Sequence, residues 1–552
     1  MSANRTRSDA GRLFVSAAWV IGLALVGKAL GLVKDIVVAA QFGTTAVMDA
    51  FLVAFTVPTI VNSWLRTPIR SGFIPIFSET AERDGEDRAW RSVGVLLTDF
   101  VAIVAVAALV VFVAAPWIVR AIAPGFDGPT HELAASLTRI MAATIAVAAA
   151  SGILSSLYHV YGIFSVPALS APVHNVILIA AAVFLATRYG IRGLAWGVLA
   201  ASVVRFLILS PMLIRNIKRM VFRIDFRHPM LLGILRLALP LFIGMAGAKL
   251  DDVVDRLFAS LLAEGSISGL AYALRLIEIP KEVLILGFST VLFPLYARLA
   301  AKGRLDELGD KLTTSMSIGF FVLLPVSVAM ALLAEPVVRL IFQRGEFDER
   351  SVAFTVRALL FYTPTVWALG LTSILTSGFV ALRDTKTPVI TGFVRLGFKV
   401  LLVYLLIGTL DHAGVALATS LSHILKIILL LIFVPRAIRR GRYGRMLRGF
   451  AGAAAATAIM GGVLYLILPY ADRLALGVEG WPRALALVAV ALVGALVYLG
   501  AAWLLARREL RDTVRTIRDG FGEIRFRALR RMGRRRGPRA PGGDDGPPLD
   551  LD

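Results

Sequence analysis

The chain has 552 residues, of which 57% are hydrophobic and only 17% are charged. Soluble globular proteins are about 45–50% apolar and about 25% charged, so this composition excludes a water-soluble multidomain enzyme. A net charge of +22 would suggest nucleic-acid binding in a soluble protein, but here the basic residues gather beside apolar stretches, and we expect no nucleic-acid partner. The absence of cysteine excludes a disulfide framework and a thiolate metal site.

Long apolar stretches recur along the chain and predict an all-α polytopic membrane protein with about 14 transmembrane helices. A helix that crosses a bilayer needs about 20 apolar residues. Three arginines precede the first stretch, as in a signal sequence, but no small-residue cleavage site follows, so we expect the first helix to be retained. The predicted spans are 13–33, 46–65, 92–119, 133–157, 166–187, 191–214, 230–260, 267–297, 312–334, 351–380, 387–408, 412–434, 447–470 and 482–506.

The distribution of Lys and Arg between the loops predicts the orientation of these spans. Basic loops of membrane proteins stay on the cytoplasmic side. Strongly basic loops at 215–227, 298–311 and 436–448 follow the sixth, eighth and twelfth spans. The turns after the seventh and eleventh spans, near Glu264 and Asp411, contain no Lys or Arg. We therefore expect both chain termini to be cytoplasmic.

The two halves of the chain carry similar short motifs at a nearly constant spacing. Gly43 and Pro58 lie 15 residues apart, as do Gly265 and Pro280, and similar pairs further along are separated by 216 to 222 residues. This spacing covers six spans, an even number, so both copies insert with the same orientation. The sequence thus predicts two six-helix lobes related by a pseudo-two-fold axis along the membrane normal, as in alternating-access transporters.

The predicted organisation has four parts. The N-terminal lobe covers 1–228, the C-terminal lobe covers 229–440, and two extra helices in 441–506 lie outside the repeat. Residues 507–552 form a basic and then acidic tail, whose first 30 residues hold twelve Arg against four acids. We expect this tail to be largely disordered, cytoplasmic and in contact with anionic lipid headgroups.

Charged residues within apolar stretches are the main candidates for a functional site, because a charge at the bilayer centre costs about 2.5–3.5 kcal/mol. We expect these residues to line a central cavity that is cationic, with acids interspersed. One group, around the first two spans, consists of Lys28, Lys34, Asp35 and Asp49. The equivalent part of the second half carries Lys249, Asp251, Asp252, Asp255, Arg256, Arg275, Glu278, Lys281 and Glu282. Further cations within apolar stretches are Arg205, Arg395, Lys399 and Lys426.

Several of these residues have an alternative structural role. Lys28 could extend to a membrane interface, but apolar residues continue on both sides of it, which favours a place in the cavity lining. Arg275 either pairs with the glutamate three residues later or contacts a ligand. Asp49 either caps the second span or binds a ligand. His174 and His423 are expected to make interhelical hydrogen bonds rather than to bind a metal.

The pattern Asp251-Asp252-x-x-Asp255 is typical of enzymes that hold magnesium and a prenyl diphosphate. A second aspartate-rich cluster on a facing helix is missing from the sequence, and Arg256 stands four residues after Asp252 as a helical ion-pair partner. The sequence therefore indicates neither a metal site nor an enzyme.

A series of family-like motifs runs in order from about residue 20 to residue 430. These motifs include Gly31-Leu32-Val33-Lys34-Asp35, Asp49-Ala50-Phe51-Leu52-Val53-Ala54-Phe55, Phe342-Gln343-Arg344-Gly345 and Asp384-Thr385-Lys386-Thr387-Pro388. Together they resemble the MurJ (MviN) family of lipid II flippases, within the superfamily of multidrug, oligosaccharidyl-lipid and polysaccharide exporters.

The resemblance implies transport of lipid II, the lipid-linked peptidoglycan precursor, to the outer leaflet of the bacterial cytoplasmic membrane by alternating access. It also implies that the two extra helices cradle a polyprenyl tail and that cations in the cavity hold the diphosphate and peptide carboxylates of the headgroup. The residues we expect to bind substrate are Lys28, Lys34, Asp49, Arg275 and Arg256. Those we expect to form coupling or structural ion pairs are Asp35, Asp255 and Glu278.

Two departures from the family leave the cargo open. Lys28 and Lys34 stand where the family usually has Arg, which keeps the charge but loses bidentate contact with phosphate. The segment after Pro58 also differs from the family pattern. Another polyprenyl-diphosphate-linked glycan is therefore an alternative cargo, and a cation-coupled exporter of small molecules is a less favoured alternative function. We expect a monomer without a cofactor, driven by the membrane potential or by a coupling cation.

Overall fold

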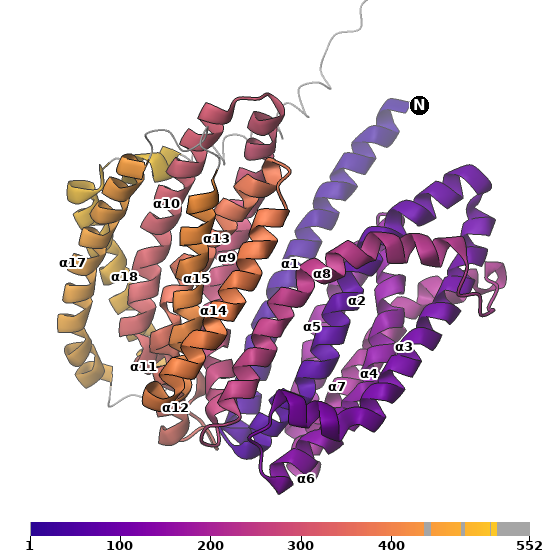
Figure 1. Ribbon diagram of the computed structural model, residues 1–552, viewed down its shortest axis with the longest axis horizontal. Helices are drawn as coiled ribbons and strands as arrows, with labels where there is room; N and C mark the ends of the chain where they lie inside the picture. The colour runs from indigo at the N-terminus through magenta and orange to yellow at the C-terminus, as the bar shows by residue number, and fades with distance from the viewer. Residues whose placement is uncertain (1, 435–442, 476–480, 508, 516–552) are drawn as a thin grey trace, which may run out of the picture.

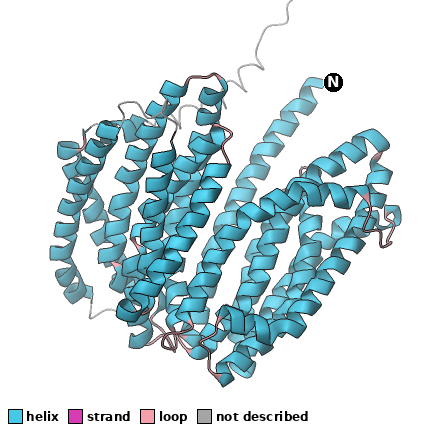
Figure 2. Ribbon diagram, in the orientation of Figure 1, coloured by secondary structure: helices cyan, strands magenta, loops and turns pink. Residues whose placement is uncertain are grey.

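The computed structural model describes residues 2–434, 443–475, 481–507 and 509–515, and this part of the chain contains helices and connecting loops but no strand (Figure 2). Each predicted span lies on a helix or on two consecutive helices. Eleven helices of the described part are long and apolar enough to cross a membrane. The prediction of an all-α membrane protein is therefore confirmed.

The N-terminal lobe is built from unusually long helices (Figure 1). Helix α1 has 41 residues, which corresponds to about 60 Å, twice the hydrocarbon thickness of a bilayer. A short π-helical turn, η1 (Ala181–Leu185), joins α5 to α6. The helices are α1 (Ser2–Phe42), α2 (Ala46–Asp84), α3 (Glu86–Ile122), α4 (Gly128–Val160), α5 (Ser165–Ala180), α6 (Ala186–Tyr189) and α7 (Ile191–Asn216).

The C-terminal lobe follows the same order, and two further helices complete the described chain. Its fourth span is divided at Thr363 into α12 and α13. The helices of this lobe are α8 (Pro229–Ala259), α9 (Ser266–Ala301), α10 (Leu305–Leu332), α11 (Ala334–Phe342), α12 (Glu349–Tyr362), α13 (Pro364–Ala381), α14 (Lys386–Leu410) and α15 (His412–Phe433). The last two helices are α17 (Tyr443–Ala475) and α18 (Trp481–Leu505).

The predicted duplication is visible in where the helices begin and in how they pack. Helices α2, α3, α4, α5 and α7 begin 219 to 221 residues before α9, α10, α12, α14 and α15, respectively. The packing also repeats: α2 contacts α4 as α9 contacts α13, α3 contacts α4 as α10 contacts α13, and α5 contacts α7 as α14 contacts α15. The chain thus contains two copies of one six-span bundle.

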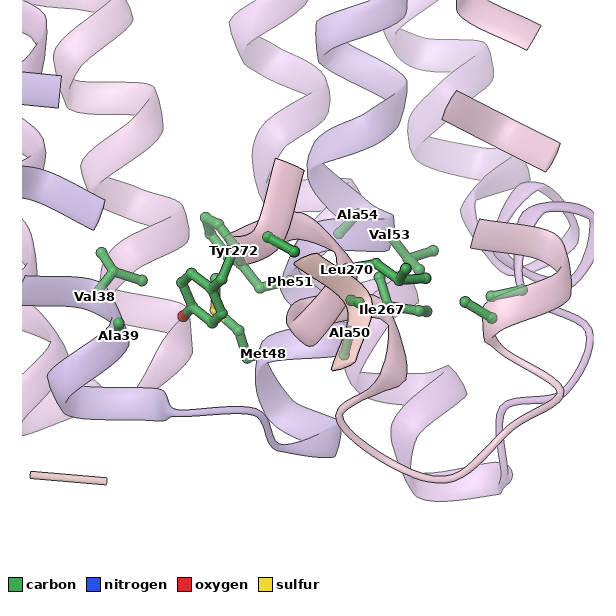
Figure 3. Packing of buried hydrophobic residues seen from close by; sticks show 14 of the residues in the cluster. Val38, Ala39, Met48, Ala50, Phe51, Val53, Ala54, Ile267, Leu270 and Tyr272 are labelled. Carbon is green, nitrogen blue, oxygen red and sulfur yellow. The ribbon is translucent and has the colours of Figure 1, made fainter. Parts of the chain in front are cut away.

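The two lobes share a hydrophobic core at one end of the molecule, which we call the closed end. This core combines α1 and α2 of one lobe with α9, α11 and α12 of the other. Figure 3 shows part of it, where Val38, Met48 and Phe51 of the first lobe lie close to Ile267 and Tyr272 of the second. At the other end, which we call the open end, each lobe has a separate core, and the lobes diverge (Figure 1).

Hydrogen bonds between the lobes reinforce the closed end. The backbone N–H of Thr44 donates to Ser351 Oγ over 3.1 Å, and the two side-chain oxygens are 2.9 Å apart. Asp348 positions this serine, because its Oδ1 accepts from the Ser351 N–H over 2.9 Å. That hydrogen bond lowers the pKa of Asp348 below its usual value.

Close backbone approach at the closed end requires glycine on both sides. Gly43 and Gly265 have positive φ angles of 52° and 88°, a conformation that residues with a side chain rarely adopt. A Cβ atom at Gly43 would overlap the carbonyl oxygen of Glu346, and one at Gly265 would overlap that of Thr44. These turns therefore let the two lobes touch backbone to backbone.

Helix α8 passes from one lobe to the other. Its first turns, with Met230, Leu231 and Ile234, belong to the core of the N-terminal lobe at the open end. Its last turns pack against α14 and α15 of the C-terminal lobe. The packing boundary between the lobes thus lies within α8 and not at residue 228.

Helices α17 and α18 pack on the outside of the C-terminal lobe, against α10 (Figure 1). The Tyr498 hydroxyl on α18 donates to the Phe321 carbonyl of α10 over 2.5 Å. Residues 509–515 continue as a helix, so this part of the predicted disordered tail is ordered. The predicted disorder of 516–552 lies outside the described residues.

A disulfide engineered across the closed end should form readily. In Thr44→Cys/Ser351→Cys, the two sulfur atoms replace oxygens that are 2.9 Å apart, and the chain has no other cysteine to compete. After cleavage at a protease site inserted into 216–228, the oxidised double variant should run as one species on a non-reducing gel. The single variant Thr44→Cys should separate into two fragments. Two fragments from the oxidised, folded double variant would contradict the contact.

Candidate functional site

Four charged side chains meet between the lobes and form what we call the central cluster: Lys34 and Asp35 on α1, and Arg275 and Glu278 on α9. Asp35 binds Lys34 Nζ over 2.6 Å and Arg275 Nε over 2.5 Å. Arg275 also contacts Glu278 over 3.1 Å. All four side chains keep between 16% and 43% of their surface exposed, so the cluster is accessible.

The central cluster depends on a glycine one turn before Asp35. A Cβ atom at Gly31 would lie 2.9 Å from a terminal nitrogen of Arg275, so the guanidinium passes directly over this position. Helix α5 supports the same part of α1, because Asn175 Nδ2 donates to the Gly27 carbonyl over 2.8 Å. The motif around Gly31 thus brings a cation from the second lobe onto the first helix.

Lys28 extends the cluster toward the open end. It lies seven residues before Asp35, about two helical turns, and therefore on the same face of α1. Its side chain is exposed. The two acids of the central cluster offset Lys34 and Arg275 in formal charge, and Lys28 adds a further positive charge.

Asp49 lies apart from the central cluster, in the closed end. Its carboxylate accepts hydrogen bonds from the backbone N–H groups of Gly265, over 2.8 Å, and Ser268, over 2.7 Å. Asp49 is only 4% exposed and therefore caps the first turn of α9 from the opposite lobe. The expected capping role is present, but for α9 and not for the helix that carries Asp49.

A second set of charges, which we call the lateral cluster, lies within the C-terminal lobe. Lys399 on α14 contacts Asp251 over 2.9 Å and Asp255 over 2.7 Å, both on α8, and Arg395 contacts Asp251 over 3.2 Å. Lys399 is fully buried and Arg395 is 7% exposed on its side chain. The two cations and two acids balance in formal charge. Sequence reasoning missed this pairing, although both pairs share the four-residue spacing of one helix face.

Several other candidates lie elsewhere than expected. Asp252 pairs with Lys249 over 3.1 Å, one turn earlier on α8, so the expected pair with Arg256 is wrong. Arg256 is half-buried on α8, and no printed ion pair of the described chain joins it to the central cluster. Lys281 and Glu282 lie outside the residues whose side chains are described. Among the described residues, no three His, Asp or Glu side chains are placed to hold a metal ion.

The two histidines also differ from expectation. The Nδ1 atoms of His174 and His423 are buried and have no hydrogen-bond partner. The prediction that both rings are fully satisfied by interhelical hydrogen bonds is therefore wrong. A buried polar atom without a partner costs about 1–3 kcal/mol, which draws attention to the space around each ring.

A family model described as lipid II flippase MurJ matches residues 38–479. The chain belongs to the MurJ family. It is 28% identical over 510 residues to the lipid II flippase MurJ of Burkholderia cenocepacia, covering 89% of this chain and 97% of the relative. It is 30% identical over 532 residues to a probable lipid II flippase MurJ of Rhizobium meliloti, covering 91% and 96%.

A solved structure supports the fold of this MurJ family member. A lipid II flippase MurJ in an inward closed conformation superposes with a TM-score of 0.73 at 24% identity, covering 88% of this chain and 98% of the other. The resemblance inferred from sequence motifs is thus confirmed, and with it the two lobes and two extra helices. The protein is a multi-pass protein of the bacterial inner membrane.

Removal of the buried lysine should destabilise the C-terminal lobe. Lys399→Met leaves Asp251 and Asp255 with too little opposite charge, and breaking a buried ion pair in this way costs about 3–5 kcal/mol. The variant should unfold at a clearly lower temperature than the wild type in detergent. Lys386→Met, which removes an exposed lysine from the same helix, is the matched control. Equal stability of the two variants would show that the lateral cluster does not support the fold.

Proposed function

We propose that the protein flips lipid II from the inner to the outer leaflet of the cytoplasmic membrane, for cell wall biosynthesis. The observation that carries this proposal is the position of the central cluster. Arg275 of one lobe and Lys34 of the other meet on the shared acid Asp35, where the lobes begin to diverge. A transporter of anionic headgroups needs cations from both moving halves at such a position.

The basic loops support a cytoplasmic open end. The loop around Met220 belongs to the open-end core of the first lobe, and the turn between Leu299 and Leu308 belongs to that of the second. Both loops are strongly basic, and such loops stay on the cytoplasmic side. In this orientation the protein is open to the cytoplasm and closed to the outside, with both termini cytoplasmic.

The headgroup of lipid II is anionic, with a diphosphate and peptide carboxylates. Each desolvated phosphate needs charged hydrogen-bond donors to offset its loss of water. In this proposal the diphosphate displaces Asp35 and Glu278 from Arg275 and Lys34, and Lys28 attracts it from the open end. Exchange of the Asp35–Arg275 pair for phosphate then links cargo binding to the relative position of the lobes.

Release on the outside requires the closed end to separate. The contacts that must break are the apolar packing around Met48 and Tyr272 and the hydrogen bonds of Thr44 and Asp49 to the other lobe. These contacts involve no ion pair among the described residues, so their separation leaves no unpaired charge behind. The closed end is therefore built to open reversibly.

The polyprenyl tail is apolar and stays in the lipid. Helices α17 and α18 lie on the outer side of the C-terminal lobe and offer a surface for it. The protein works without chemistry on its cargo, as a monomer and without a cofactor, and the membrane potential or a coupling cation supplies the driving force.

Loss of a cation from the central cluster should abolish flipping while the protein remains inserted. Lys28→Ala and Arg275→Ala should each fail to rescue a strain depleted of its own lipid II flippase, because the phosphates lose a positive partner. Lys28→Arg should rescue growth, since the guanidinium keeps the charge and adds donors. Arg192→Ala, an exposed arginine on α7, is the control and should rescue growth. Rescue by both Lys28→Ala and Arg275→Ala would refute a cationic site.

The proposed orientation can be tested on a chain that has no native cysteine. Glu264→Cys and Asp411→Cys place thiols at exposed turns of the closed end. Lys302→Cys places one at an exposed turn of the open end. An impermeant thiol reagent added to intact cells should label the first two and not the third. The reverse pattern would invert the proposed orientation.

A further inference from the structure

The N-terminal lobe contains a cavity of about 340 Å³ between α2, α4, α5 and α7, separate from the central cluster. Ligand pockets in proteins measure about 300–1,000 Å³, so this cavity lies within their range. It is lined by polar side chains from all four helices, although it lies inside a membrane-spanning bundle.

The lining is rich in hydrogen-bond acceptors. The hydroxyl groups of Thr59, Ser63 and Ser202 donate to carbonyl groups of their own helices, which leaves their oxygen lone pairs as acceptors. Asn62 Oδ1 and His174 Nδ1 are buried without a hydrogen-bond partner. A ligand that fits this lining therefore brings several hydroxyl or amide donors.

One cation completes the lining. Arg205 on α7 faces the same cavity, and His174 lies within electrostatic range of both Arg205 and Lys34. A guanidinium inside an apolar bundle favours a carboxylate as its partner, which it can bind through two parallel hydrogen bonds. Donor groups together with a carboxylate describe an acidic saccharide or its attached peptide, and not an apolar compound.

The cavity lies beside the central cluster. Asn175, the residue after His174, donates to α1 at Gly27, one turn from Gly31. Its Nδ2 atom lies 3.5 Å from the place of a Cβ at Gly31, and Arg275 lies 2.9 Å from the same place. One ligand can therefore occupy both sites. The side chains of Asn62, His174 and Arg205 are half-buried, so the cavity is not sealed.

We infer that this cavity is a subsite for the hydroxyl- and carboxylate-bearing part of the cargo headgroup, with Arg205 as the partner of a carboxylate. This inference rests on the proposed function and divides the headgroup between two places. The central cluster holds the diphosphate, and the cavity in the N-terminal lobe recognises the saccharide and peptide portion. The cavity would thus distinguish the complete precursor from a bare polyprenyl diphosphate.

The test compares two lipids by native mass spectrometry of the full-length protein: lipid II, and undecaprenyl diphosphate, which has no saccharide. Arg205→Gln and Asn62→Leu should each lower lipid II retention about tenfold or more, in line with loss of a hydrogen bond to a charged group. Retention of undecaprenyl diphosphate should not change. Arg275→Gln should weaken both lipids, and the control Arg192→Gln neither. Asn62→Leu keeps the test valid if Arg205→Gln does not fold.

Three outcomes would overturn the inference. If the cavity variants weakened both lipids equally, Arg205 would belong to the diphosphate site. If they weakened neither, the cavity would hold only water, while the proposed function would stand. If the wild-type protein retained neither lipid, the proposed function would fail together with this inference.

Discussion

The shared hydrophobic core at one end of the molecule is the contact on which the rest of the structure depends. Here the two lobes meet through apolar side chains and through turns at Gly43 and Gly265 that allow backbone contact. At the other end their cores are separate. Because the apolar contact and the few hydrogen bonds are confined to one end, the lobes can separate there without disrupting either bundle. This asymmetry gives a duplicated bundle a direction.

The charges within the membrane divide into two sets with different consequences. The lateral cluster joins α8 to α14 inside one lobe, is almost entirely buried and balances its own charge. It holds the lobe together whatever the other lobe does. The Asp35–Arg275 pair of the central cluster instead crosses between the lobes and remains accessible. An anion that competes for Arg275 therefore acts directly on the contact between the lobes, whereas the same competition in the lateral cluster would damage the fold.

Hydropathy and spacing predicted the helices, the duplication and the family, since each of these properties is repeated along the chain. The Arg275–Glu278 contact was also foreseeable, because it lies within one helix turn. The Asp35–Arg275 pair joins residues 240 positions apart, and Asp49 caps a helix 216 positions away. Such contacts follow from the packing of the lobes and leave no local pattern. The lateral cluster was an intermediate case, because the matched four-residue spacing on α8 and α14 was visible but the two helices were not known to be neighbours.

The central claim is that the closed end opens as the open end closes around the cargo. Distances between spin labels test it most directly, with one pair across the closed end (Glu132→Cys/Glu264→Cys) and one across the open end (Glu82→Cys/Lys302→Cys), all at exposed positions. On addition of lipid II in membranes that support flipping, the closed-end distance should gain a longer population and the open-end distance a shorter one. A closed-end distance that stays unchanged while lipid II is being flipped would contradict the account.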